Sequence, residues 1–399
     1  MTTSARERLQ SLPPLARESA QTPHSGIREI ANLAQMNSEA IRLEIGQPNF
    51  RTPEHVAAAA RRAIDEGWTF YTQTQGLLSL REALAEKLAR VNGIAAATPD
   101  RITCGVGGVG VIAAAFASVL EAGDEVLLPD PAWPNFRIMC AWAHARPVSY
   151  RCPAQAGYQP DVEHLASLIT PRTKLIVVNS PNNPTGAIWS RDALTRIAEL
   201  AQRHGIWMLS DECYDQIVLD GEIQSSAALV PEAPIISVFT FSKTYAMTGW
   251  RLGYGVAPEP LIDTMAKVLE STCSCSPTVS QKAAEAALAG PQEPVAEMVA
   301  AYRRRRDLVA DILRADGLLA ALPAGAFYVM ADVSPSGMES RDFALALLRE
   351  RGVAVAPGSA FGNVAAKAVR ISLASSEEDL REGVTRLCTF VRERAGARG

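Results

Sequence analysis

Short apolar runs alternate with helical patterns between about residues 100 and 260, and this alternation constrains the fold more than any other feature of the chain. The runs are rich in valine, isoleucine and leucine and occupy residues 125–128, 175–178, 206–209, 235–240 and 252–256. They are continuously apolar, which is typical of strands covered on both faces. Helical patterns such as residues 191–204 separate them. The chain is therefore predicted to have an α/β fold with a mostly parallel sheet flanked by helices.

The pattern changes beyond about residue 290. A long helix is predicted over residues 294–315, short strands near 326–331 and 368–373, and a final helix over about 377–395. Residues 43–46 have the composition of one more short strand. This change predicts a large domain over residues 51–290, a smaller α+β domain over residues 291–399, and a separate N-terminal segment over residues 1–50.

Composition excludes several classes of function. The chain has 399 residues, of which 48% are hydrophobic and 21% charged, with a formal net charge of −4. These values are ordinary for a globular protein. The basic cluster at residues 303–306 lies in a helical pattern and is predicted to be a solvated helix face, so no nucleic-acid partner is expected.

No membrane or metal function is expected either. Residues 1–10 lack the apolar core of a signal peptide, and the longest apolar segment, residues 106–120, is too short to span a bilayer. The chain has 7 cysteines, and the pair Cys273 and Cys275 has no second pair to complete a zinc site. Reduced thiols and a cytoplasmic location are expected.

Lys243 is a candidate for a reactive lysine at the end of a strand. It follows the apolar run 235–239, and strand ends in open α/β sheets are where such folds place their chemistry. Most lysines are solvated surface charges, so the residue type alone decides nothing. A desolvated lysine with a cation such as Arg251 nearby, however, can lose its proton near neutral pH and attack an aldehyde. Hydroxyls at Thr240, Ser242 and Thr244 strengthen this interpretation.

The run 240–251, with the sequence TFSKTYAMTGWR, resembles the Schiff-base lysine motif of the class I/II aminotransferases in the aspartate-aminotransferase-like superfamily. Similar motifs follow the family order from about Leu43 to Leu373. The resemblance implies a fold type I enzyme with pyridoxal 5′-phosphate (PLP) bound to Lys243. It also implies that residues 1–50 pack with the smaller domain, so that both chain ends form it.

The implied reaction is transamination (EC 2.6.1.-), in which an amino group moves from an L-amino acid to a 2-oxo acid by a ping-pong mechanism. Two alternatives stay open. Another PLP-dependent lyase or synthase can use the same scaffold, and some regulators carry this domain as a non-catalytic binding module. The few residues before Gly46 leave too little room for a DNA-binding head.

Asp211, Tyr214 and Asn183 follow other apolar runs. A carboxylate at a strand end needs a partner when it is buried, and the pyridinium N–H of PLP supplies one. Asp211 taken alone favours a helix N-cap, because aspartates at strand ends are common in that role. The motifs around Tyr214 and Asn183 resemble those whose side chains donate to the phenolic oxygen of the cofactor. The resemblance thus gives Lys243, Asp211 and Tyr214 catalytic roles.

A glycine-rich run at residues 105–110 matches the dinucleotide fingerprint G-x-G-x-x-G, with Asp130 at the spacing of a ribose contact. A nicotinamide dehydrogenase would leave Lys243, Asp211 and Asn183 without a role, whereas PLP uses them all. Glycines at a helix N-terminus also suit a single phosphate. The resemblance assigns the phosphate to Gly107, Gly108, Val109, Thr240, Ser242 and Arg251.

The remaining assignments come from the resemblance alone. Trp133 matches the aromatic residue that stacks on the pyridine ring, and Tyr71 matches the tyrosine that reaches the phosphate in the neighbouring subunit. The latter implies a homodimer with shared active sites. Arg370, Gly46 and Asn183 match the residues that bind the substrate α-carboxylate. Val109 departs from the family pattern, in which a polar side chain is usual.

Overall fold

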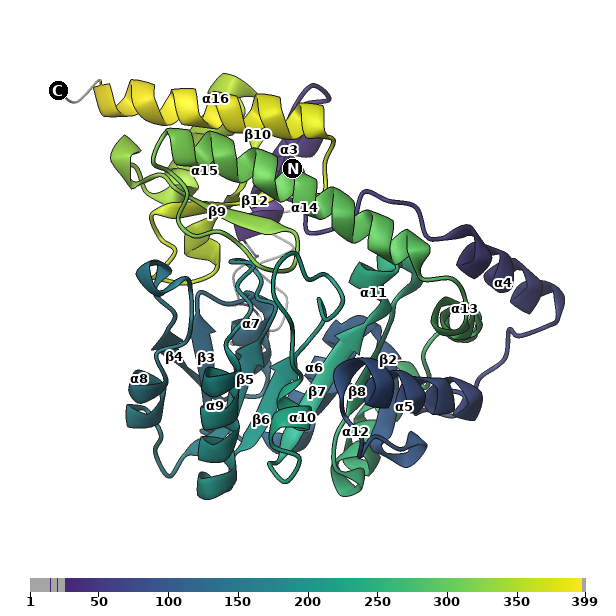
Figure 1. Cartoon of the computed structure of the whole chain (residues 1–399). Coiled ribbons are helices and arrows are strands. Elements are labelled where there is room, and N and C mark those ends of the chain that lie inside the picture. The colour runs from purple at the N-terminus through teal and green to yellow at the C-terminus, as the bar shows by residue number, and fades with distance from the viewer. Residues whose placement is uncertain (1–14, 16–19, 21–25, 397–399) are drawn as a thin grey trace, which may run out of the picture.

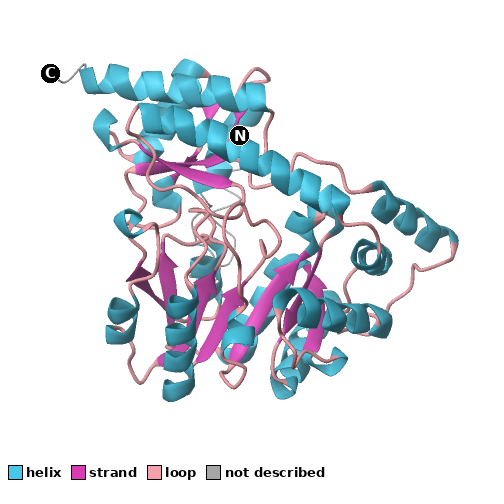
Figure 2. Cartoon of the chain, viewed as in Figure 1, coloured by secondary structure: helices cyan, strands magenta, loops and turns pink. Residues whose placement is uncertain are grey.

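The computed structural model describes residues 15, 20 and 26–396, and within that part the centre of the molecule is a seven-stranded sheet (Figures 1 and 2). The strand order is β2-β8-β7-β6-β5-β3-β4, and β8 alone runs in the direction opposite to the other strands of this sheet. The strands are β2 (Ile102–Val106), β3 (Glu125–Asp130), β4 (Arg146–Arg151), β5 (Thr173–Asn179), β6 (Trp207–Asp211), β7 (Ile235–Thr240) and β8 (Leu252–Val256). The predicted α/β fold with a mostly parallel sheet is confirmed.

Helices cover both faces of the sheet, which explains why its strands are continuously apolar. In β5, Leu175 and Val177 pack with α6, α7 and α12, whereas Ile176 and Val178 pack with α8 and α9 on the opposite face. Successive side chains of a strand point to opposite faces, so the run from Leu175 to the end of β5 is buried throughout, and Lys174 is the one exposed residue of the strand. A third apolar cluster joins α4, α5 and α13 to β2 and β8.

The helices of this part are α4 (Glu54–Asp65), α5 (Leu78–Asn92), α6 (Gly107–Val119), α7 (Asn135–Trp142), α8 (Val162–Ser167), α9 (Arg191–His204), α10 (Ser226–Leu229), α11 (Phe241–Thr244), α12 (Glu259–Cys273) and α13 (Thr278–Ala289). Short 3₁₀ turns lie at Pro99–Arg101, Ala154–Ala156 and Thr248–Trp250, and further along at Ser334–Ser336 and Gly358–Ala360. The helix predicted over residues 191–204 is confirmed as α9. In α9, the Ser190 side chain accepts a hydrogen bond from Ala193 N at the start, and Gly205 adopts a left-handed conformation at the end.

A second group of elements lies above the carboxyl ends of the large sheet (Figure 1). It contains the helices α3 (Gly26–Gln35), α14 (Glu293–Ala315), α15 (Ser340–Arg351) and α16 (Glu377–Gly396). Its strands are β1 (Ile41–Arg42), β9 (Tyr328–Asp332), β10 (Val353–Ala354), β11 (Ala356–Pro357) and β12 (Ala368–Ser372). Because β1 pairs with β10 and α3 contacts α15, residues from both chain ends lie together. Part of the predicted segment 1–50 lies outside the described residues.

The predicted strand at residues 43–46 is wrong. The strand is β1, and the ladder ends once Leu43 N has donated to Ala354 O at 2.9 Å. Beyond it, the carbonyls of Glu44 and Gly46 accept hydrogen bonds from two side chains, Arg370 and Lys243. The carbonyls of Glu44 and Gly46 therefore bond to side chains of the pocket, whereas the carbonyl of Leu43 accepts from Ser372 N of β12 at 2.8 Å.

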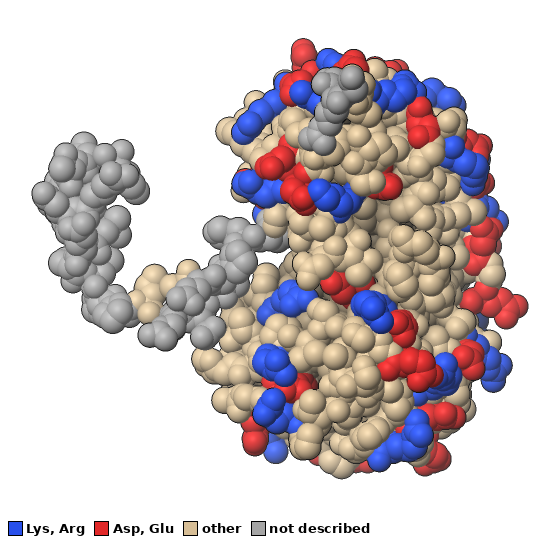
Figure 3. Space-filling model, turned by 90° about the vertical axis from the view of Figure 1, so that its left-hand side faces the viewer, with Lys and Arg blue, Asp and Glu red and all other residues tan. Residues whose placement is uncertain are grey.

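The surface shows no concentration of one charge on the face in Figure 3, where basic and acidic side chains are interspersed. None of the helices formed by the described residues is long and apolar enough to cross a membrane. Among the same residues, no group of three or more His, Cys, Asp or Glu side chains is arranged to hold a metal ion.

Candidate active site

A pocket of about 290 Å³ lies where the carboxyl ends of β5, β6 and β7 face the second group of elements. Thr240 and Asp211 are the last residues of β7 and β6, and parallel strands bring such ends to one edge of the sheet. The pocket is lined by Ile27, Gly46, Gly108, Val109, Ile112, Trp133, Asn183, Asp211, Cys213, Tyr214, Thr240, Ser242, Lys243, Arg251, Tyr328 and Arg370. Of the predicted site residues, only Gly107 and Tyr71 do not line it.

One end of the pocket is built to receive an anion. Helix α6 begins there, so its first backbone N–H groups, including those of Gly108 and Val109, have no partner within the helix. Gly107 has φ of +71°, and a Cβ on it would lie 2.5 Å from Nη2 of Arg251. A glycine at 107 thus allows the guanidinium to lie against the start of the helix.

Two hydroxyls and one arginine complete this end. The oxygens of Thr240 and Ser242 lie 3.0 Å apart at the start of α11, and Thr240 also caps that helix. Arg251 donates to Thr248 O at 2.9 Å, which leaves other guanidinium N–H groups for a ligand. Helix N–H groups, hydroxyls and a guanidinium together fit a phosphate dianion.

Lys243 lies at the centre of the pocket, and its Nζ donates to Gly46 O at 2.7 Å. Burial lowers the pKa of this amine to about 8, with help from the positive charges of Arg370 and Arg251 and against the influence of Cys213 and Asp211. The neutral, nucleophilic form is therefore accessible near physiological pH.

Asp211 is buried on the floor of the pocket. Its Oδ1 accepts a hydrogen bond from Cys213 N at 3.2 Å. Burial raises the pKa of the carboxyl, while that same contact with Cys213 and the positive charge of Lys243 act in the opposite direction. A buried carboxyl of this kind gains from a cationic N–H partner, and a protonated pyridine nitrogen is one.

Tyr214 and Tyr328 form a pair of buried hydroxyls 2.8 Å apart. The sequence predicted Tyr214 but missed Tyr328, which belongs to β9. Arg370 of β12 pairs with Met330 in the antiparallel register, and Tyr328 lies two residues away on the same face. Knowledge of this register would have placed Tyr328 in the site, but the register cannot be read from the sequence.

Arg370 is 2% exposed and forms the opposite end of the pocket. Its Nη1 donates to Asn183 Oδ1 at 2.9 Å and its Nη2 to Glu44 O at 2.5 Å. Within the described part of the chain, its Nε is buried without a hydrogen-bond partner. An unpaired, buried guanidinium N–H is costly, and a carboxylate ligand would satisfy it.

The two predicted aromatic residues differ in position. Trp133 lines the pocket and packs edge-on against Phe136, with ring centroids 5.4 Å apart. Tyr71 is 85% exposed and lines a separate surface depression with Phe70 and Thr278. Tyr71 therefore does not contribute to the pocket of its own chain.

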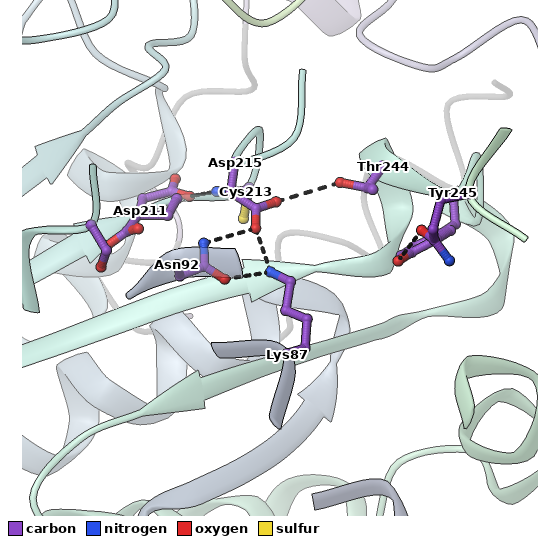
Figure 4. Close-up of polar contacts among 10 residues, drawn as sticks. Lys87, Asn92, Asp211, Cys213, Asp215, Thr244 and Tyr245 are labelled. Atoms are coloured by element: carbon purple, nitrogen blue, oxygen red, sulfur yellow. Dashed lines mark hydrogen bonds and ion pairs between the residues drawn. The ribbon is translucent and has the colours of Figure 1, made fainter. Parts of the chain in front are cut away.

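A buried ion pair lies directly behind the site (Figure 4). Lys87 of α5 pairs with Asp215, which follows Tyr214 in the chain. Asn92 accepts from Lys87 at 2.8 Å and donates to Asp215 at 3.1 Å. The two residues are 128 positions apart, so the sequence alone does not predict this pair.

The arrangement as a whole supports one chemistry. A phosphate cradle, a lysine amine with a lowered pKa, a buried carboxyl and two phenol or amide donors fit the functional groups of pyridoxal phosphate. The partly unsatisfied guanidinium of Arg370 fits an amino-acid carboxylate beside it. A dinucleotide would leave Lys243 and Arg370 unexplained.

Related sequences point the same way. A model of the family aminotransferase class I and II matches residues 38–387. The chain is 41% identical over 360 residues to an aspartate/prephenate aminotransferase of Thermus thermophilus, across 89% of this chain and 91% of the relative. It is 37% identical to aromatic-amino-acid aminotransferase 2 of Thermococcus litoralis, across 93% of this chain and 96% of the relative.

The fold is also shared with solved structures. The aspartate aminotransferase of Thermus thermophilus with maleate matches with a TM-score of 0.90 and 39% identity, over 95% of this chain and 100% of that one. An aspartate aminotransferase of Rhizobium meliloti matches with a TM-score of 0.89 and 36% identity, over 96% of this chain and 99% of that one. The chain therefore belongs to the class I and II aminotransferases, enzymes that transfer amino groups with pyridoxal phosphate as their cofactor.

Proposed function

We propose that this enzyme exchanges an amino group between an L-amino acid with an apolar side chain and a 2-oxo acid. The composition of the pocket lining is the observation that supports a substrate with an apolar side chain. Its cations are Lys243, Arg251 and Arg370, and the other lining residues include three aliphatic side chains, Ile27, Val109 and Ile112.

Each cation of the pocket already has a task in this proposal. Arg251 faces the phosphate end with the N-terminus of α6, and Arg370 binds the substrate α-carboxylate with Asn183 and the backbone of Gly46 beside it. Lys243 is needed for the reaction itself. No further cation among the described lining residues remains for a second carboxylate, whereas an apolar side chain can contact the aliphatic residues.

Bound pyridoxal phosphate supplies an aldehyde carbon that accepts amines and a protonated ring that withdraws electrons from the substrate Cα. Lys243 Nζ removes the Cα proton, and its pKa of about 8 suits proton transfer near neutral pH. Asp211 keeps the ring nitrogen protonated. Tyr214 and Asn183 donate to the phenolic oxygen, and Trp133 packs on the ring face.

The phosphate is held by the remaining residues of that end. In this proposal, the N–H groups of Gly108 and Val109 and the hydroxyls of Thr240 and Ser242 donate to it together with Arg251. Gly107 contributes through its backbone conformation. These contacts anchor the cofactor, so that its reactive carbon stays within reach of Lys243.

The substrate class can be tested with donors of similar size. The side chains of leucine and aspartate have the same number of non-hydrogen atoms and the same branching, but only aspartate carries a second carboxylate. We expect kcat/KM for leucine and phenylalanine to exceed that for aspartate at least about 10-fold, since an unpaired charge in an apolar wall costs more than 1.4 kcal/mol. A higher kcat/KM for aspartate than for leucine would refute the proposed class. The names of the relatives do not decide it, because they include both aspartate and aromatic aminotransferases.

We further propose that the enzyme is a homodimer in which Tyr71 completes the site of the partner subunit. The support is the exposure of Tyr71 and Phe70, at 85% and 80%, because large aromatic side chains exposed side by side are typical of interfaces. In the same proposal, residues 51–290 form the large domain and residues 291–399 with the N-terminal segment form the smaller one.

Subunit mixing tests the shared site. Tyr71→Ala and Lys243→Ala variants are each expected to be almost inactive. Hybrids of the two would contain one site with both native residues, so mixing after reversible dissociation should restore activity to one site in each hybrid dimer. If Tyr71 served its own subunit, the mixture would stay inactive.

A further inference from the structure

Tyr328 contacts two of the predicted site residues, Tyr214 and Arg370. Its hydroxyl lies 2.8 Å from that of Tyr214, and the centre of the Arg370 guanidinium lies 4.3 Å from its ring centroid. The side chain is 1% exposed and belongs to β9. Neither the motifs nor the proposed mechanism gives this tyrosine a task.

We propose that Tyr328 is a positioning residue, whose hydroxyl donates to the Tyr214 hydroxyl and thereby directs the single Tyr214 proton to the phenolic oxygen of bound pyridoxal phosphate. A phenol has one proton to donate and also accepts hydrogen bonds. If Tyr214 donated to Tyr328, it would have no proton left for the cofactor. The inference rests on the role proposed above for Tyr214.

The surroundings hold the Tyr328 hydroxyl in place. A Cβ on Gly46 would lie 2.4 Å from this oxygen, so any side chain at position 46 would displace it. The charged and titratable groups that face the pair are Arg370 over the Tyr328 ring, Lys243 at 5.9 Å from the Tyr214 ring centroid, and Cys213 beside Tyr214. Burial raises the pKa of both phenols, so each keeps its proton over the working pH range.

The arrangement has a measurable consequence. A hydroxyl that accepts a hydrogen bond becomes a stronger donor, because bonds in such chains polarise one another. Tyr214 would therefore stabilise the ionised phenolic oxygen of the cofactor more strongly when Tyr328 donates to it. Loss of the Tyr328 hydroxyl should raise the pH at which the visible absorbance of the bound cofactor changes.

The experiment compares holoenzyme variants by the pH midpoint of that absorbance. Tyr328→Phe removes one hydroxyl and keeps the ring beneath Arg370. Tyr214→Phe and the double variant complete a thermodynamic cycle. Tyr302→Phe is the matched control, because Tyr302 is a buried neighbour whose hydroxyl has no hydrogen-bond partner among the described residues and which does not line the pocket.

We expect Tyr214→Phe to raise the midpoint by about 1 pH unit and Tyr328→Phe by about 0.3 unit, since the second acts only through the first. In the Tyr214→Phe background, Tyr328→Phe should have no further effect, and Tyr302→Phe should leave the midpoint unchanged. These results would support the inference.

Two outcomes would overturn it in different ways. A midpoint that responds to Tyr214→Phe but not to Tyr328→Phe, or a Tyr328→Phe shift that persists in the Tyr214→Phe background, would remove the role of Tyr328 alone. A midpoint insensitive to Tyr214→Phe would remove the proposed role of Tyr214 and, with it, the inference.

Discussion

Removal of one partner from the Lys87–Asp215 pair should destabilise the enzyme strongly, although neither residue lines the pocket. Their side chains are 6% and 3% exposed, so each charge depends on the other for compensation. Loss of one partner of a buried pair typically costs about 3–5 kcal/mol, out of a total stability of about 5–15 kcal/mol.

The contacts that remain set the magnitude of each single change. Lys87→Met leaves the Asp215 carboxylate with Asn92 Nδ2 at 3.1 Å, which places the cost at the lower end, about 3 kcal/mol. Asp215→Leu leaves the ammonium with Asn92 Oδ1 at 2.8 Å and with the face of Phe239, whose centroid is 4.8 Å away, and should cost about the same. The double variant buries no charge, so it should lie within about 1 kcal/mol of the native enzyme.

Urea unfolding at a fixed cofactor concentration measures these differences. The control is Arg196→Met, which breaks the surface pair with Glu163 and should cost less than about 1 kcal/mol, because both side chains are exposed. Single variants at Lys87 and Asp215 that lose no more than this control, or a double variant no more stable than the single ones, would refute the reasoning.

Three further predictions follow from the buried groups of the site. The rate at which the cofactor-free protein takes up pyridoxal phosphate should rise with pH around a midpoint near 8, because only the uncharged Lys243 amine reacts and burial lowers its pKa to about 8 from 10.5. The control Lys243→Ala should form no attachment that borohydride can reduce. A midpoint near the ordinary lysine pKa would contradict the argument. Burial raises the pKa of Glu212 to about 7 from 4.5, so the folded protein holds this proton more tightly than the unfolded chain and stability should fall as pH rises between these values. Glu212→Gln should flatten that part of the profile in thermal unfolding, and an unchanged slope would show that Glu212 is already ionised. Arg370→Lys should raise KM for the amino donor about 10- to 100-fold through loss of the bidentate contact, as measured by initial rates, whereas an unchanged KM would remove Arg370 from the carboxylate site.

The sequence predicts the large sheet well because its signal is local. Each side of β5 faces a different helical layer, and burial of both sides requires an unbroken apolar run that can be recognised without knowledge of the neighbours. The strand β4 was not predicted, since it lies at the edge of the sheet and begins with the exposed Arg146. Edge strands need less apolar sequence, so composition identifies them poorly.

The residues of the site likewise fall into those that local sequence predicts and those that it does not. Lys243 and Asn183 lie a few residues beyond buried strands and Asp211 is the last residue of one, so their position along the chain predicts their position in space. Tyr328 and Ile27 enter the pocket from β9 and α3, and their places depend on how the second group of elements packs over the sheet. No local pattern encodes that packing. The Lys87–Asp215 pair was missed because its two residues are 128 positions apart in the chain.

The segment after β1 connects the site to the strand that was wrongly predicted at residues 43–46. Lys243 bonds to the carbonyl of Gly46 and Arg370 to that of Glu44, so two neighbouring backbone groups hold the two cations that face the substrate. Had residues 43–46 continued the ladder with β10, these carbonyls would have been used by the sheet. The early end of the strand therefore frees backbone acceptors for the two side chains to which we assign catalysis and carboxylate binding, Lys243 and Arg370.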